Sequence, residues 1–134
     1  MSVVLSKRDT TELTVVTKSR ELAKYTITIC SNNENFPKKY RWCLTSKIVD
    51  AAITISNEII EANSIYIDSE ESLNKRKDHQ TEAMCKTHSL LSMIDLAYVT
   101  FGIESSRIEY WTGLVLEVQA LLRNWRKSDK ARKF

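Results

Sequence analysis

The chain has 134 residues, of which 43% are hydrophobic and 28% are charged. This length and composition are typical of one folded domain, 1–134, and argue against a disordered or membrane-embedded chain. Two glycines and one proline are too few for the turns of a β-sandwich or for a glycine-rich phosphate loop, so nucleotide-cradling enzymes are poor candidates. Three cysteines without paired spacing, and an N-terminus without the apolar run of a secretory signal, predict a protein of the reducing cytoplasm.

The formal net charge of +3 is distributed unevenly along the chain. The C-terminal tail, residues 123–134, has a local charge of +5, whereas residues 1–122 together have a charge of −2. A basic tail of this kind indicates an acidic partner, either nucleic acid or protein. The cations of the tail are Arg123, Arg126, Lys127, Lys130, Arg132 and Lys133.

Apolar residues at helical spacing predict a first helix over about residues 9–31. Its weak point is the segment 25–29, where β-branched residues alternate as they do in a strand. A single strand would have no pairing partner elsewhere in the chain, so a helix is the better interpretation. A second helix is expected from Pro37 to about Ile67, because proline is tolerated at the first position of a helix.

The third predicted helix follows the linker 68–72, which supplies N-cap residues and first-turn acids, and it ends before Gly102. The fourth is expected to begin at Ser106, which has capping-box spacing to Glu109. Its apolar residues fall within one arc of the width that a core-facing stripe needs. Four helices joined by short links predict an all-α fold, an up-down-up-down antiparallel four-helix bundle.

The second helix has two apolar stripes rather than one. The first, which includes Leu44, Ile48 and Tyr66, is expected to face the core of the bundle. The other lies roughly 140° further round the helix and needs a third helix of the chain or a second copy of the protein to cover it. We predict that this stripe is the oligomer interface, formed by Trp42, Val49, Ile53, Ile60 and Ile67.

No set of side chains in the sequence predicts catalysis or metal binding. His79, Cys85 and His88 come nearest to a metal site, but the spacing of six residues turns His79 off the face that the other two share. Glu58 and Glu61 pair at helical spacing, and a solvated acidic face is a better interpretation of them than acid–base chemistry. The sequence therefore predicts no catalytic residue, no metal ligand and no cofactor.

Three cations, Lys38, Lys39 and Arg41, lie in the first turns of the second helix. The helix dipole disfavours positive charge there, so these residues are candidates for binding a partner. Trp42 beside them is as suited to stacking on a base as to packing, whereas the other two tryptophans fall on the core stripe. The topology places this group at the opposite end of the bundle from the basic tail, which shares its end with Lys7, Arg8, Lys75, Arg76 and Lys77.

Much of the chain resembles two related groups of small four-helix proteins. In their second-helix region both groups look like the segments 36–40, 44–48, 51–52 and 59–63, which read FPKKY, LTSKI, AA and IIEAN. One group is encoded in intervening sequences of bacterial large-ribosomal-RNA genes, and the other is the accessory variability determinant (Avd) family of diversity-generating retroelements. The fourth helix resembles the Avd ending through Tyr110, Leu114, Val118, Leu121, Leu122, Trp125, Lys127 and Ser128.

The resemblance to Avd implies a homopentamer of four-helix protomers, which would use the second apolar stripe. It also implies a protein without catalysis of its own that binds a reverse transcriptase and its template RNA, so that adenine-specific mutagenic cDNA is made. This chain departs from the family in being only mildly basic, with no cation in the third helix after Lys86. RNA binding is therefore expected in the tail and at the start of the second helix.

These features favour a non-enzymatic, oligomeric accessory protein of a reverse transcriptase, with no membrane partner. The alternative is a stand-alone RNA-associated bundle of the ribosomal intervening-sequence type. A third class, a small helical enzyme or metal carrier, has the least support from the residues.

Overall fold

The computed structural model describes the backbone of residues 7–134 and the side chains of residues 14–134. Four α-helices make up this part of the chain: α1 (Lys7–Cys30), α2 (Ser46–Ser64), α3 (Glu70–Phe101) and α4 (Ser105–Lys130). A 3-10 turn (Lys38–Tyr40) and a π-helical turn (Arg41–Thr45) lead directly into α2. The described part of the chain contains no strand, so the all-α prediction is confirmed, including the helical conformation of segment 25–29.

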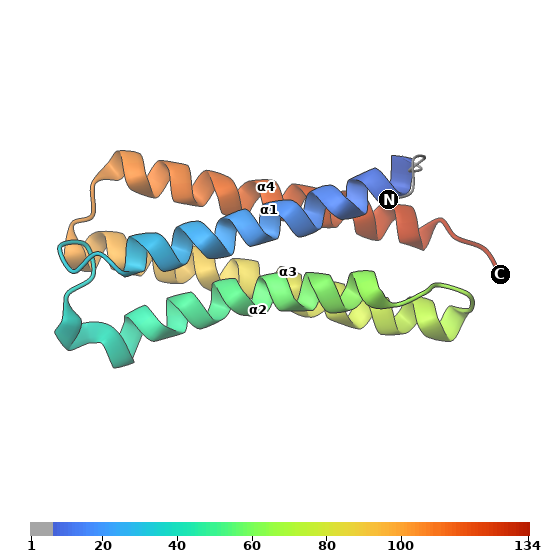
Figure 1. Cartoon of the computed structure of the whole chain (residues 1–134), viewed down its shortest axis with the longest axis horizontal. Coiled ribbons are helices and arrows are strands. Elements are labelled where there is room, and N and C mark those ends of the chain that lie inside the picture. Colours follow the sequence, from blue (N-terminus) through green and yellow to red (C-terminus); the bar gives the residue numbers. More distant parts are fainter. Residues whose placement is uncertain (1–6) are drawn as a thin grey trace.

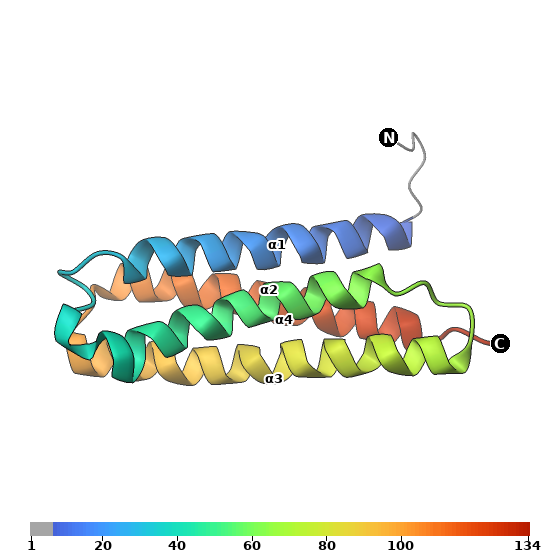
Figure 2. The ribbon, with the colours of Figure 1, turned by 60° about the horizontal axis from the view of Figure 1, so that its bottom comes forward.

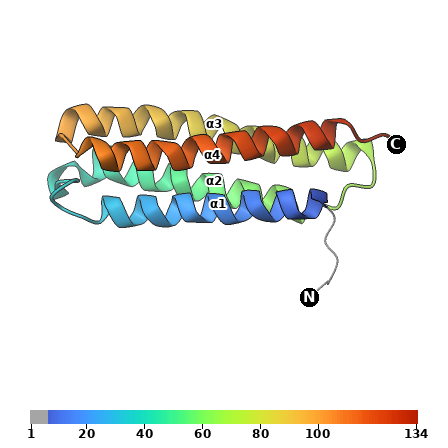
Figure 3. The same ribbon diagram turned by 90° about the horizontal axis from the view of Figure 1, so that it is seen from above.

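The helices lie side by side and consecutive helices run in opposite directions (Figures 1 and 3). Helix α1 packs against α2 and α4, and α3 packs against the same two, which closes the ring of an up-down-up-down bundle. The link between α1 and α2 lies at the opposite end from the C-terminus (Figure 2). Within residues 7–134, no helix is both long and apolar enough to cross a bilayer.

The bundle core forms where the apolar stripes of the four helices meet. Trp111 and Trp125 of α4 are fully buried, as the width of the α4 stripe predicts. Phe36 from the α1–α2 link is also buried, and its ring packs edge-on against Phe101, with ring centroids 5.5 Å apart. This aromatic contact closes the core at the end where α2 begins.

Two polar contacts inside the core connect helices in a defined register. The indole Nε1 of Trp111 donates to Oγ1 of Thr26 over 2.9 Å, which joins α4 to α1. Nε2 of Gln119 donates to Oγ1 of Thr87 over 3.0 Å, which joins α4 to α3. A buried donor without a partner costs about 1–3 kcal/mol, so these bonds disfavour other arrangements of the same apolar stripes.

The helix ends follow the sequence expectations in part. Gly102 ends α3 in the left-handed conformation, with φ +65°, as predicted. The linker before α3 also caps that helix as expected, through a reciprocal capping box between Ser69 and Ser72. The capping box predicted for Ser106 and Glu109 is wrong, because α4 begins one residue earlier and the Ser106 hydroxyl donates to the Glu104 carboxylate.

The end of α2 departs from prediction, and Arg76 of α3 supplies the reason. Its guanidinium donates to the backbone carbonyls of Ala62 over 3.1 Å and Ile65 over 2.7 Å. Because these carbonyls at the helix C-terminus are satisfied from outside, the helix stops at Ser64 and Ile65 becomes extended. Tyr66, expected in the core, is therefore 82% exposed, and Ile67, expected on the exposed stripe, is buried.

Arg76 also forms a buried ion pair with Asp129 near the end of α4. The Nη1 atom lies 3.1 Å from Oδ1 of Asp129, and the two residues are 4% and 2% exposed. Gln80 donates to the other carboxylate oxygen over 2.9 Å, and Nε of Arg132 donates to Oδ1 over 3.3 Å. Arg76 therefore lies at the end of the bundle where the sequence places it, but its guanidinium is buried, because the Asp129 carboxylate and the two carbonyls bind it in the interior.

We predict that Asp129→Ala lowers the free energy of unfolding by about 3 kcal/mol, because it leaves the Arg76 guanidinium buried without its carboxylate. Urea denaturation followed by circular dichroism measures the change. Asp95→Ala, which removes an exposed acid of α3, is the control and should change stability by less than about 0.5 kcal/mol. Equal effects of the two substitutions would contradict a structural role for the pair.

Candidate nucleic-acid interface

A groove of about 460 Å³ lies between the start of α3 and the end of α4. Four basic residues of α4 lie three or four positions apart and therefore share one face of the helix: 123, 126, 127 and 130. Lys77 of α3 faces them across the groove. Five cations therefore line one concave surface: Lys77, Arg123, Arg126, Lys127 and Lys130.

The groove stays positive although Asp129 is one of its lining residues. The Asp129 carboxylate is already bound by Arg76 and Arg132, so its charge is compensated within the protein. Arg126 is held in place because its Nη2 donates to Oγ1 of Thr81 over 3.1 Å. A concave array of cations, whose one lining acid is already compensated, is suited to binding successive phosphates of a polyanion.

The basic tail divides into residues that line the groove and residues that do not. Arg123, Arg126, Lys127 and Lys130 line it. Arg132 does not line the groove, and its bond to Asp129 gives this cation a structural role. Lys133 is exposed beyond the end of α4.

Other cations of this end contribute less to the groove. Lys75 forms an exposed pair with Glu71, in which Nζ and Oε1 lie 3.6 Å apart. The side chains of Lys7 and Arg8 fall outside the described residues. Among the cations of this end that lie outside the tail and have described side chains, Lys77 is the one that lines the groove.

The second predicted group, Lys38, Lys39 and Arg41, lies at the opposite end of the bundle (Figure 1). All three residues are exposed, and the turns they occupy contain no acidic residue. Lys38 and Arg41 line a small groove of about 310 Å³ beside the α1–α2 link. The Nζ atom of Lys39 lies 5.1 Å from the centroid of the neighbouring Tyr40 ring.

The predicted oligomer stripe is partly exposed along α2. Trp42 is 80% exposed, Ile53 and Ile60 are 37% and 38% exposed, and Val49 is half-buried. Ile27 of α1 lines a shallow groove with Trp42 and Val49, so the apolar surface extends from α2 onto α1. The buried Ile67 is not part of this surface, which corrects the predicted set.

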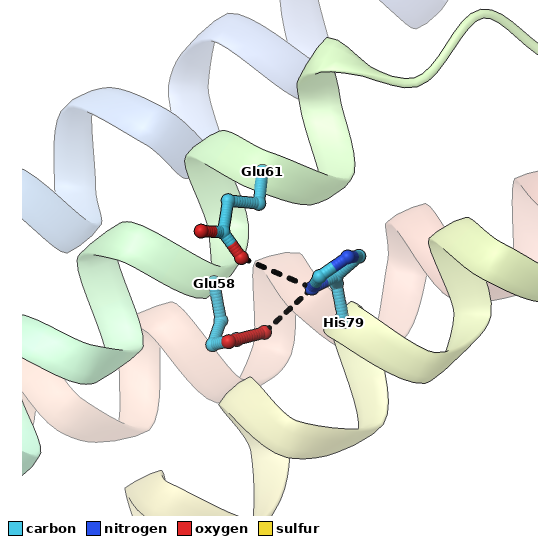
Figure 4. Close-up of side chains that lie close together, drawn as sticks. All are labelled: Glu58, Glu61 and His79. Atoms are coloured by element: carbon cyan, nitrogen blue, oxygen red, sulfur yellow. Dashed lines mark hydrogen bonds and ion pairs between the residues drawn. The ribbon is translucent and has the colours of Figure 1, made fainter.

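His79, for which the sequence predicts no metal site, lies opposite two acids of α2. Nδ1 of His79 lies 2.7 Å from Oε2 of Glu58 and 3.3 Å from Oε2 of Glu61 (Figure 4). Residue spacing within one helix could not reveal this group, because His79 comes from α3 and both acids come from α2.

The cysteines have contrasting surroundings: Cys43 and Cys85 are exposed, and Cys30 is buried. Burial raises the pKa of the Cys30 thiol to about 12, so this thiol stays protonated at neutral pH. Cys30 belongs to the core cluster of the bundle. It therefore packs as a small apolar side chain.

Comparisons with known proteins were made at the level of family, sequence and structure. No family model, curated protein or solved structure matches the chain. A functional interpretation therefore depends on three surfaces: the α3–α4 groove, the cations before α2 and the apolar face of α2.

We predict that neutralising the second cation group with Lys38→Gln, Lys39→Gln and Arg41→Gln weakens partner binding without lowering stability. The substitutions remove charge that opposes the helix dipole, so stability should be unchanged or rise by a few tenths of a kcal/mol. Melting temperature and a reverse transcriptase pull-down, measured on the same preparations, provide the test. Retained binding would show that these cations are only solvated, and a lower melting temperature would assign Arg41 a packing role.

Proposed function

We propose that the chain is a non-catalytic, self-assembling accessory protein that binds a retroelement reverse transcriptase and its template RNA in the cytoplasm. The α3–α4 groove is the observation that supports this proposal most directly, because five cations line one concave surface. Its reverse transcriptase component rests on the resemblance of the second and fourth helices to Avd proteins. The groove alone argues for a polyanion as the ligand.

The chemistry of the groove favours phosphate over a protein carboxylate surface. Arginine and lysine are mixed along α4, and Arg126 is fixed by Thr81, which suits contacts to a regular backbone of charges. Exposed aromatic side chains for base stacking do not line this groove. The proposed binding is therefore governed by the RNA backbone, and base sequence contributes little to it.

Self-assembly is proposed through the α2 face. An 80% exposed tryptophan followed by two partly exposed isoleucines, Ile53 and Ile60, forms an apolar surface of the kind that interfaces bury. Assembly would multiply the basic groove by the number of protomers, five in the arrangement that the resemblance implies. Several weak phosphate contacts on one scaffold then add through effective concentration.

The groove is tested by the triple variant Arg123→Gln, Lys127→Gln and Lys130→Gln. We expect weaker binding of template RNA and a flatter dependence of log K on log salt, by about 0.7 for each RNA phosphate that the variant no longer neutralises. Fluorescence anisotropy with labelled RNA at several salt concentrations measures both quantities. Deleting the tail would be a poor test, because it would also remove Asp129 from its buried ion pair.

The matched control removes three exposed cations from other surfaces, with Arg20→Gln, Lys24→Gln and Lys47→Gln. It makes the same change in net charge, so any difference from the groove variant reports the position of the charge. Equal loss of affinity in both variants would show that net charge alone drives binding and would refute a specific groove.

Assembly is tested by Ile53→Asp, which places a charge in the apolar face of α2. We expect the assembly to dissociate while helicity is largely retained, because Ile53 is already 37% exposed in the single chain. Light scattering gives the mass, and circular dichroism gives the helicity. Val99→Asp, at a 70% exposed position of α3, is the control, and a wild-type mass of 15.5 kDa would refute assembly.

Genomic context separates the proposed function from the ribosomal alternative. A neighbouring reverse transcriptase gene with an imperfect repeat pair would support the retroelement role. A position within a ribosomal RNA gene would support the stand-alone RNA-associated protein, for which the same groove would serve. Co-purification of the chain with the neighbouring reverse transcriptase is the direct biochemical test.

A further inference from the structure

Three side chains of types that can bind metal lie close together on the α2–α3 side of the bundle. Glu58 and Glu61 lie one turn apart on α2, and His79 extends from α3 toward both of them (Figure 4). One ligand atom of each, Nδ1 of His79 and a carboxylate oxygen of each acid, lies within 4.8 Å of the other two. We propose that Glu58, Glu61 and His79 bind a divalent transition-metal ion that connects α2 to α3.

The charge balance of the group favours a cation. Over the part of the chain with described side chains, neither Glu58 nor Glu61 forms an ion pair with a lysine or arginine. Two carboxylates therefore share one imidazole, which supplies at most one positive charge. The Glu58 side chain is 21% exposed, so water screens this uncompensated charge incompletely. A divalent ion would balance both carboxylates.

The distances are compatible with ligands around one ion. Zinc bonds to nitrogen and oxygen of about 2.0 Å place tetrahedral ligand atoms about 3.3 Å apart. The Nδ1 atom of His79 already lies 3.3 Å from Glu61, and its 2.7 Å distance to Glu58 is a hydrogen bond that a bound ion would replace. The neutral imidazole would then carry its proton on Nε2, which leaves the lone pair of Nδ1 for the metal.

The ligand chemistry selects the class of metal. An imidazole nitrogen with two carboxylates suits zinc and other first-row divalent ions, whereas calcium and magnesium prefer sites made of oxygen alone. Three protein ligands leave a tetrahedral ion one open position, which water can occupy. His79, at 34% side-chain exposure, and Glu61, at 56%, keep that position accessible from solvent.

The sequence spacing turned His79 away from Cys85 and His88, and the fold gives it Glu58 and Glu61 as partners. Cys85 and His88 are exposed further along α3, and His88 lines another groove with Lys47 and Asp50. These two residues can bind metal adventitiously, since they lie three apart on one helix. They therefore supply the controls for the proposed site.

Isothermal titration of the full chain with zinc chloride, with the thiols kept reduced, is the test. We expect one ion per chain, bound roughly tenfold or more weakly by His79→Ala and by Glu61→Gln. His88→Ala and Cys85→Ser should bind as the wild type does. Zinc should also raise the melting temperature of the wild type and of these controls, but not that of His79→Ala.

The proposal is overturned if the wild type binds no zinc, if His79→Ala and Glu61→Gln bind as the wild type does, or if His88→Ala or Cys85→Ser removes binding. Glu61→Gln keeps the test valid should His79→Ala fail to fold, because the Glu61 side chain is more than half exposed. RNA affinity does not enter this test, so its outcome is independent of the function proposed above.

Discussion

The buried guanidinium of Arg76 connects α3 to α4 through its ion pair with Asp129 and to α2 through the carbonyl of Ala62. A buried guanidinium must have partners for its charge and its N–H groups, and here they come from α2, from the link after it and from α4. The same side chain therefore ends α2, positions the start of α3 and holds the last turn of α4. Moving any one of these elements would leave a charge or a carbonyl unsatisfied in the interior.

This pair also determines the charge of the candidate RNA surface. An acid in the middle of the basic groove would repel phosphate if it were free, but Asp129 is bound from behind by Arg76. The Asp129 carboxylate thus belongs both to the buried ion pair and to the lining of the groove. The cations that line the groove remain available because Asp129 is compensated by residues other than theirs.

The two basic groups are separate surfaces at opposite ends of the bundle (Figure 1). Helix α4 has 26 residues, which at a rise of 1.5 Å per residue makes it about 39 Å long, and the groups lie near its opposite ends (Figure 1). The apolar face of α2 runs between them.

The sequence by itself determined the helices, the core stripe of α4, the stop at Gly102 and the clustering of cations, because these depend on spacing within about one turn. Tertiary structure alone decided the features that need partners from separate helices. Arg76 could be recognised as internal only once Ala62, Ile65 and Asp129 surrounded it. The end of α2 and the burial of Ile67 followed from those bonds. Likewise, His79 contacts Glu58 and Glu61 because α2 and α3 pack together. Residue spacing along a single helix does not predict such a contact.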